Sequence, residues 1–258
     1  MTKLFITAAM VLATLTSQAQ VSEKRNTQNF SKIEVASGIE LVYTENEAVS
    51  ISVEAENDTE LKNIITAADG KTLRLFYNND QKSGTVKFLK VYVNANKISS
   101  FKASASAKIV FQNLVKSEDL TIDLSSGGTF NGRLAPNLST TIKASSGSLF
   151  CGNVQTQNLR GEFKSGAKIS VAGNAKKVMI STATKSHCNA KNLASEKATI
   201  NSREFSSVLI NGQGIINANP ETGASITYFG KPKERNLGEN SVAVKIKKEK
   251  NPIHIAMD

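Results

Sequence analysis

Residues 139–166 read STTIKASSGSLFCGNVQTQNLRGEFKSG and contain the same pattern twice. A short stretch of alternating apolar and polar side chains runs into a turn of small residues, Ser146-Gly147, and a second such stretch runs into Ser165-Gly166. Alternation at every second residue is typical of a β-strand with one buried face. This segment therefore predicts short strands that are joined by tight turns.

Turns of this kind recur through the middle and the C-terminal half of the chain. The intervals between them are 21, 20, 19, 17, 20 and 20 residues. A nearly fixed interval in this range indicates a stacked repeat, in which each unit buries its apolar face against its neighbours. The predicted turns are Ala105-Ser106, Ser126-Gly127, Ser146-Gly147, Ser165-Gly166, Thr182-Ala183, Ser202-Arg203 and Thr222-Gly223.

The residue four places after each turn is expected to point into the core. It is large and apolar in five units, but it is a serine after Thr182-Ala183 and after Ser202-Arg203. We interpret these two irregular units as drift in the repeat, with a binding surface as the alternative. A glycine closes most units and is expected to provide the positive φ of a corner. These glycines are Gly132, Gly152, Gly173, Gly212 and Gly230.

Two architectures are compatible with units of this design. A meander would pair consecutive strands antiparallel, whereas a solenoid would stack equivalent strands in parallel. Equivalent positions keep their character from unit to unit, which favours the solenoid, because these positions become direct neighbours there. We predict an all-β protein, a parallel β-helix with coils of ~20 residues.

The two ends of the chain differ from the repeats. Residues 1–19 combine a positive charge, an apolar run and a small-residue cleavage site, as in a secretory signal peptide. Asp69-Gly70, between two strand-like stretches, predicts a hairpin. No later stretch is long and apolar enough for a transmembrane helix. The predicted division is a signal peptide at 1–19, a β-rich cap continuous with the solenoid at 20–98, β-helix repeats at 99–232 and a basic C-terminal cap or tail at 233–258.

The two cysteines, Cys151 and Cys188, belong to units that are separated by a whole further unit. Two coils of a parallel stack lie roughly 9–10 Å apart, because adjacent strands are separated by about 4.8 Å. A disulfide requires Cα atoms within about 7 Å of each other. We therefore predict two buried free thiols.

The repeated Ser-Gly turns, an opening Phe-x-x-Ile-x-Val at Phe30 and a closing Ile-Thr-Tyr-Phe-Gly-Lys-Pro at 226–232 resemble the putative auto-transporter adhesin head-GIN domain family (DUF2807). The resemblance covers residues 30–232 and is carried by the series of turns rather than by any one turn. It implies a right-handed parallel β-helix in an exported bacterial protein with a role in adhesion. It carries over no catalytic residue.

The acidic residues do not form the pattern of a catalytic site. No aspartate lies between Leu124 and Met257, and the glutamates of the repeats occupy different coils and registers. A carboxylate pair for glycoside hydrolysis must converge within about 5–10 Å. His187 and Cys188 are adjacent, so they point to opposite faces of a strand and cannot share a metal. We predict no enzyme, no cofactor, and no catalytic, cofactor-binding or metal site. The scattered glutamates are Glu162, Glu196, Glu204 and Glu221.

The formal net charge of +10 is compatible with an anionic partner, although lysines also keep strand edges soluble. Lys143, Lys164 and Lys185 are evenly spaced, but their offsets from the turns differ, so we expect them not to stack. Export and the lack of clustered aromatic residues disfavour nucleic acid binding.

Three functions stay open. The favoured one is an exported, non-catalytic envelope or surface protein that adheres to an anionic glycan or an envelope protein. The alternatives are a periplasmic structural scaffold that binds another envelope protein and a carbohydrate-active β-helix enzyme. The sequence assigns no binding residues, no oligomeric state, and no choice among periplasm, outer membrane and cell surface.

Overall fold

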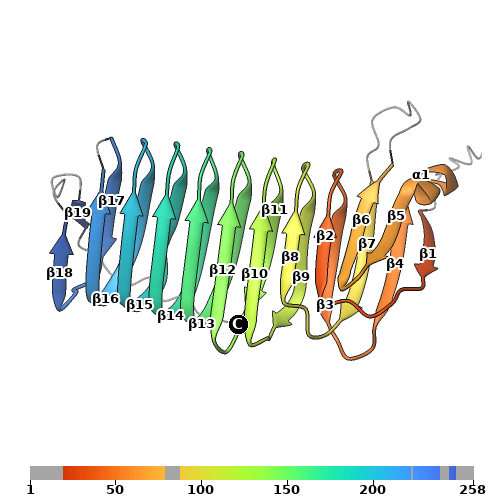
Figure 1. The fold of residues 1–258 in the computed structure, drawn as a ribbon, viewed down its shortest axis with the longest axis horizontal. Coiled ribbons are helices and arrows are strands. Elements are labelled where there is room, and N and C mark those ends of the chain that lie inside the picture. Colours follow the sequence, from red (N-terminus) through yellow and green to blue (C-terminus); the bar gives the residue numbers. More distant parts are fainter. Residues whose placement is uncertain (1–19, 79–87, 222, 239–243, 248–258) are drawn as a thin grey trace, which may run out of the picture.

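The computed structural model describes residues 20–78, 88–221, 223–238 and 244–247. These residues form a β-solenoid of about seven turns, drawn out as one long row of strands (Figure 1). The signal peptide expected at 1–19 and much of the basic cap or tail expected at 233–258, namely residues 239–243 and 248–258, lie outside the described residues. The first elements are β1 (Val21–Arg25), β2 (Lys32–Val35), β3 (Glu40–Glu45), β4 (Ser50–Ala55), α1 (Asp58–Asn63), β5 (Ile64–Asp69), β6 (Thr72–Tyr77), β7 (Leu89–Ala95), β8 (Ser100–Ala103) and β9 (Lys108–Val115). The others are β10 (Asp119–Leu124), β11 (Thr129–Leu134), β12 (Ser139–Ala144), β13 (Leu149–Phe163), β14 (Lys168–Thr182), β15 (His187–Ser202), β16 (Ser207–Pro220), β17 (Ser225–Phe229), β18 (Glu234–Leu237) and β19 (Val244–Lys247).

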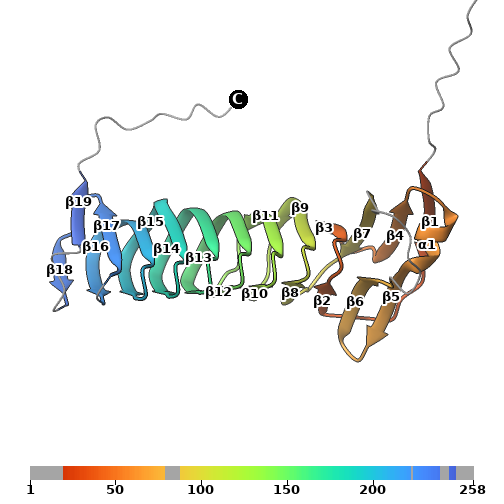
Figure 2. The same cartoon turned by 90° about the horizontal axis from the view of Figure 1, so that it is seen from above.

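The strands form two facing layers, which Figure 2 shows from above. We call them the front sheet and the back sheet, after their positions in Figure 1. The long strands β13 to β16 bend at their middle and contribute one half to each layer.

The pairing of strands within the repeats is parallel throughout, so the predicted solenoid is confirmed and the meander is excluded. The front sheet runs β5-β6-β2-β8-β10-β12, then the second halves of β13 to β16, then β18; the back sheet runs β1-β4-β7-β3-β9-β11, then the first halves of β13 to β16, then β17 and β19.

β2 and β3, which follow β1 in the chain, lie inside the stack rather than at its N-terminal end. β2 lies between β6 and β8, and β3 lies between β7 and β9. The chain then runs outward through β4 to β7 and returns to continue the solenoid at β8. The outermost strands pair antiparallel, and the expected hairpin at Asp69-Gly70 joins β5 to β6.

A column of turns along one edge of the solenoid joins the front sheet to the back sheet. The turn residues have left-handed backbones, and amides donate to carbonyls of the next turn, as from Gly147 to Ser165 and from Gly166 to Thr184, at 3.0 and 2.9 Å. The next bond in this column runs from Lys185 to Glu204 at 2.9 Å. Two predicted turns are therefore wrong: Thr182-Ala183 and Ser202-Arg203 precede the true turns, Thr184-Lys185 and Glu204-Phe205.

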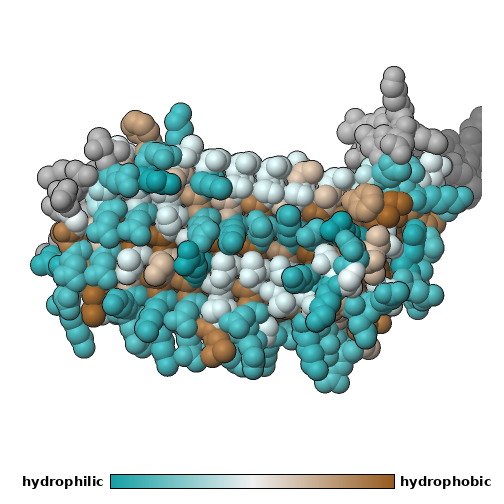
Figure 3. All heavy atoms as spheres, in the orientation of Figure 1, coloured by the Kyte–Doolittle hydropathy of each residue, from teal (hydrophilic) through white to brown (hydrophobic). Residues whose placement is uncertain are grey.

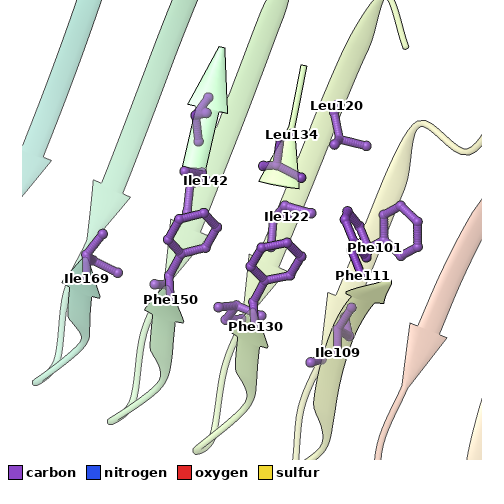
Figure 4. Close-up of a cluster of buried hydrophobic side chains, with 14 of the residues drawn as sticks. Phe101, Ile109, Phe111, Leu120, Ile122, Phe130, Leu134, Ile142, Phe150 and Ile169 are labelled. Carbon is purple, nitrogen blue, oxygen red and sulfur yellow. The ribbon is translucent and has the colours of Figure 1, made fainter. Parts of the chain in front are cut away.

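The corrected turns restore a regular core. The residue four places after each turn is now apolar in every coil, and strand register places these residues in one line. The N-terminal part of this line is reinforced by aromatic rings, some of which are labelled in Figure 4. The two coils that the sequence analysis regarded as irregular are therefore regular, because their turns had been placed two residues too early. The line contains Ile109, Phe130, Phe150, Ile169, Cys188, Val208 and Ile226.

The glycines that were expected at corners have two roles. Gly173 and Gly230 have φ of +113° and +91°, as predicted. For Gly132, Gly152 and Gly212 the prediction is wrong, because they have no positive φ and instead leave room for large side chains. A Cβ added at Gly152 would come within 2.7 Å of the Phe150 ring.

Candidate functional site

The outer face of the front sheet carries side chains in straight columns, because every second residue of each strand points outward and the strands are in register. One column alternates in charge over six consecutive strands and then continues with uncharged polar residues. Figure 3 shows that hydrophilic side chains cover most of this face. The column runs Arg74, Glu34, Lys102, Asp123, Lys143, Glu162, Ser181, Asn201 and Asn219.

The back sheet repeats this arrangement near its N-terminal end. Glu40 lies between two lysines, and its carboxylate oxygens are 3.5 Å from Lys90 Nζ and 3.1 Å from Lys108 Nζ. Glu54 faces Lys90 from the other side. Opposite charges in direct register stabilise a sheet by about 0.2–1 kcal/mol, and like charges destabilise it. The charged faces are therefore self-compensating, which a formal charge of +10 does not reveal.

One strand pair in the described part of the chain departs from this rule. Lys177 of β14 is in direct register with Lys197 of β15, and no acidic residue is in register with either. Eight other direct pairs of charged residues in the described strands join opposite charges. Both lysines are exposed. This pair is the candidate functional site, because it is the one place in the described strands where two like charges are in direct register.

The two lysines border a hollow of about 510 Å³ on the front face. Met179 lies between the lysine column and the charge column, and 48% of it is exposed. The hydroxyl groups of Thr141 and Thr199 also line the hollow. Arg160 lines it too, but its Nε lies 2.8 Å from Glu162 Oε1, so its charge is partly compensated. The hollow thus combines two cations without acidic partners, hydroxyl groups and the exposed apolar side chain of Met179, while the apolar residues Leu159 and Val178, which also line it, are buried.

Sequence reasoning missed these lysines, although a signal was present. Lys177 and Lys197 each lie seven residues before the true turn of their coil. Equal offset means direct register in a solenoid, so a comparison of all charged positions by offset would have found the pair. The prediction that Lys143 does not stack on another lysine is confirmed, since this residue is in register with Asp123 and Glu162.

The structure does not bring the predicted acidic residues together. Glu162 lies in the charge column of the front sheet, whereas Glu204 lies in the turn column. In the part of the chain that the structure describes, no group of three or more histidine, cysteine, aspartate or glutamate residues could hold a metal ion.

Thr182 and Ser202, which mark the irregular units, are buried and face the core. Their hydroxyl groups lie 2.9 Å apart, and each lies 3.0 Å from Ser206 Oγ. The three side chains are nearly inaccessible to solvent. They form an internal hydroxyl cluster, which takes the place of apolar residues without offering a surface.

Both cysteines are free, as predicted, but only Cys188 is buried. Burial raises the pKa of its thiol to about 12. Cys151 is exposed, which corrects the prediction of two buried thiols: it follows Phe150, whose side chain points inward, and so points outward itself. His187 also points outward, and its Nδ1 lies 2.7 Å from Ser207 Oγ.

A second hollow, of about 760 Å³, lies where β3, β7 and β9 end. Glu45 and Glu118 line it together with Lys97 and Lys116. Burial raises the pKa of Glu45, while the backbone amide and the charge of Lys116 oppose this rise. Because Glu47 and Asp119 also line it, this hollow holds four acidic and two basic residues and lacks the single sign of charge found at Lys177 and Lys197.

Comparison with known proteins places the fold in a family. Residues 29–232 match the model of the family described as putative auto-transporter adhesin, head GIN domain. The chain belongs to this family. The head-GIN family supports an adhesion-type role for a surface or exported protein. No curated protein matches the chain.

Several solved structures share the fold of this head-GIN protein. A putative adhesin from Parabacteroides merdae has a TM-score of 0.78 at 15% identity, over 90% of this chain and 96% of that one. A putative lipid binding protein from Parabacteroides distasonis has a TM-score of 0.78 at 16% identity, over 90% and 97%. A putative adhesin from Bacteroides fragilis has a TM-score of 0.63 at 17% identity, over 90% and 96%. At these identities the likeness shows the fold alone.

The described residues of the head-GIN chain contain no helix that is long and apolar enough to cross a membrane.

Proposed function

We propose that this chain is an exported, non-catalytic adhesion protein of the cell envelope or surface, which contacts a glycan or an envelope protein through the outer face of its front sheet. The observation that carries this proposal is the arrangement of that face. Polar and charged side chains lie there in straight columns along the solenoid, whereas the acidic residues of the repeats stay apart.

Such a face suits repeated contacts better than chemistry. The strands are fixed by parallel ladders on both sides, so the spacing of the side chains is set before a partner arrives. A binding surface that is already ordered loses less conformational freedom on association than a flexible one does. Catalysis would require groups that converge on one reacting atom, and the columns hold their side chains parallel instead.

The test attaches the protein to beads as residues 20–258 and measures retention of bacterial cells under flow. In a Cys151→Ser background, Asn201→Cys carries a maleimide-linked polyethylene glycol on the front face, and Ser170→Cys carries the same group on the back face. Both positions are exposed. We expect the front-face label to reduce retention about tenfold and the back-face label to leave it unchanged. Equal loss from both labels, or no retention by the unlabelled protein, would contradict the proposal.

Two further measurements separate the alternatives. Labelling of intact cells with an impermeant reagent is expected to modify the protein if it acts at the surface, and a protein protected in intact cells but labelled after lysis would favour the periplasmic scaffold. Incubation with acidic polysaccharides is expected to release no reducing ends. Their release would indicate a carbohydrate-active enzyme.

A further inference from the structure

We propose that Lys177 and Lys197 bind the carboxylate groups of an acidic polysaccharide that lies across the front sheet. This inference rests on the proposed function and names the partner that the front face would take. It begins from one exception in the arrangement of charges: Lys177 and Lys197 are in direct register, whereas every other direct pair of charged residues in the described strands joins opposite charges.

Neighbouring residues do not neutralise the positive charges of Lys177 and Lys197. Lys177 is flanked in its column by Asn158, and Lys197 is flanked by Ile215. No ion pair in the described part of the chain involves either lysine. In the free protein, only solvent therefore screens the repulsion between these two exposed like charges. An anionic ligand that reached both would remove this repulsion and add charge-assisted hydrogen bonds.

The spacing of the lysines favours a ligand with more than one negative charge. Adjacent strands in a sheet are separated by about 4.8 Å, so the two ammonium groups offer neighbouring positions along the solenoid axis. A polymer with regularly repeated carboxylates can place one carboxylate on each ammonium group, whereas a single small anion has only one negative group for the two lysines.

The surroundings favour a sugar over a lipid. Thr141 and Thr199 present hydroxyl groups to the hollow, and Met179 presents one half-exposed thioether. A sugar ring has hydroxyl edges and a less polar face, which this mixture matches. An acyl chain would require an enclosed apolar cavity, whereas this hollow lies on the outer face of the sheet, where two lysines, an arginine and hydroxyl groups border it.

The test uses residues 20–258 and immobilised polygalacturonate at low salt, with neutral dextran as a blank. We expect Lys177→Gln/Lys197→Gln to weaken binding about tenfold, as for the loss of two exposed ion pairs. The matched control is Lys168→Gln/Lys185→Gln, which removes the same charge from exposed positions of the same two coils but outside the hollow. The control is expected to bind as the unaltered protein does.

A second variant separates binding from folding. Lys177→Glu would face Lys197 with an opposite charge, as elsewhere in the sheet, and is expected to raise Tm by about 1–3 °C. The same variant is expected to lose binding to polygalacturonate. A gain in stability with a loss of binding would show that the lysine pair serves a ligand at the expense of the fold.

Three outcomes would overturn the inference. Equal weakening by the control variant would mean diffuse attraction by net charge. Binding to vesicles of phosphatidylglycerol, but not to polygalacturonate, would mean a lipid headgroup instead. Cell retention without any binding to polygalacturonate would refute this inference while leaving the proposed function in place.

Discussion

Phe130 and Phe150 stack face to face in the core, with ring centroids 4.9 Å apart and ring planes inclined by only 8°. They occupy the same position of consecutive coils, β11 and β13, and are in direct register. Strand register brings the two rings together, because side chains of equivalent positions lie one above the other at the spacing of the strands. The stack is thus a direct consequence of the repeat.

Phe150→Ala is expected to reduce the free energy of unfolding by about 3–5 kcal/mol, since it removes a buried ring and leaves a cavity between two layers. The adjacent Leu149→Ala is the matched control, because 45% of Leu149 is exposed and it points the other way. The control should change stability by about 0.5 kcal/mol or less. Urea denaturation of both variants makes the measurement, and similar losses would mean that Phe150 is not part of a tightly packed core.

The sequence predicted this line of core residues at Phe130 and Phe150, because a clear Ser-Gly turn precedes each. It could not predict why Gly152 is a glycine. The reason is the ring of Phe150, which would meet a Cβ at that position, and this contact becomes visible only when the rotamer of the ring is known.

Lys143→Glu is expected to destabilise the fold by about 1–2 kcal/mol, because it replaces two attractions, to Asp123 and Glu162, with two repulsions. Lys168→Glu makes the same change of net charge, but its direct neighbours are Leu149 and His187. Lys168→Glu should therefore reduce the free energy of unfolding much less than Lys143→Glu does. Thermal unfolding at low salt measures the difference, which should shrink in 1 M salt, where screening acts within about 3 Å. A difference that persists at high salt would argue against the electrostatic explanation.

The positions of two turns, Thr184-Lys185 and Glu204-Phe205, could not be predicted from residue types. Sequence reasoning sought small residues and found Thr182-Ala183 and Ser202-Arg203, whereas the chain makes left-handed turns at Thr184-Lys185 and Glu204-Phe205. Non-glycine residues in the left-handed region are uncommon, so local preference argues against them. The stack imposes them, because each turn amide donates to the carbonyl of the next turn.

This error did not hide the lysine pair, because both turns were placed two residues too early and Lys177 and Lys197 keep equal offsets from them. It did make the serines at 186 and 206 look like breaks in the core, although the residues that line the core are Cys188 and Val208. The charge columns depend on exact register across many strands, which the approximate period of the sequence does not supply.

Cys151 is expected to react with a maleimide in the native protein, whereas Cys188 should react only after unfolding. Mass spectrometry should therefore detect one adduct in buffer and two in guanidinium chloride. Two adducts in buffer would contradict the burial of Cys188, and a disulfide between the two would contradict the register of β13, β14 and β15.

The thiol of Cys188 also predicts a pH dependence. Its pKa rises from 9.0 to about 12 in the folded protein, because burial disfavours the thiolate. Below about pH 9 the thiol is protonated in both states, and its contribution to the stability of the folded protein is fully present. As the pH rises toward 12, the unfolded chain releases a proton that the folded protein retains, so the free energy of unfolding falls. Cys188→Ala has no thiol to ionise at this position, so its free energy of unfolding should decline less than that of the unaltered protein between pH 9 and 11. Parallel curves for the two would contradict the shift.

The hydroxyl cluster of Thr182, Ser202 and Ser206 should behave as one unit. Ser206→Ala is expected to cost about 1–3 kcal/mol, because it leaves two buried hydroxyl groups with fewer partners. Thr182→Val should cost about 1 kcal/mol, since Ser202 and Ser206 can still bond to each other. The triple variant Thr182→Val/Ser202→Ala/Ser206→Ala removes every member, so it should lose less stability than the sum of the single changes. Urea denaturation measures this coupling, and strictly additive losses would mean that the three hydroxyl groups act independently.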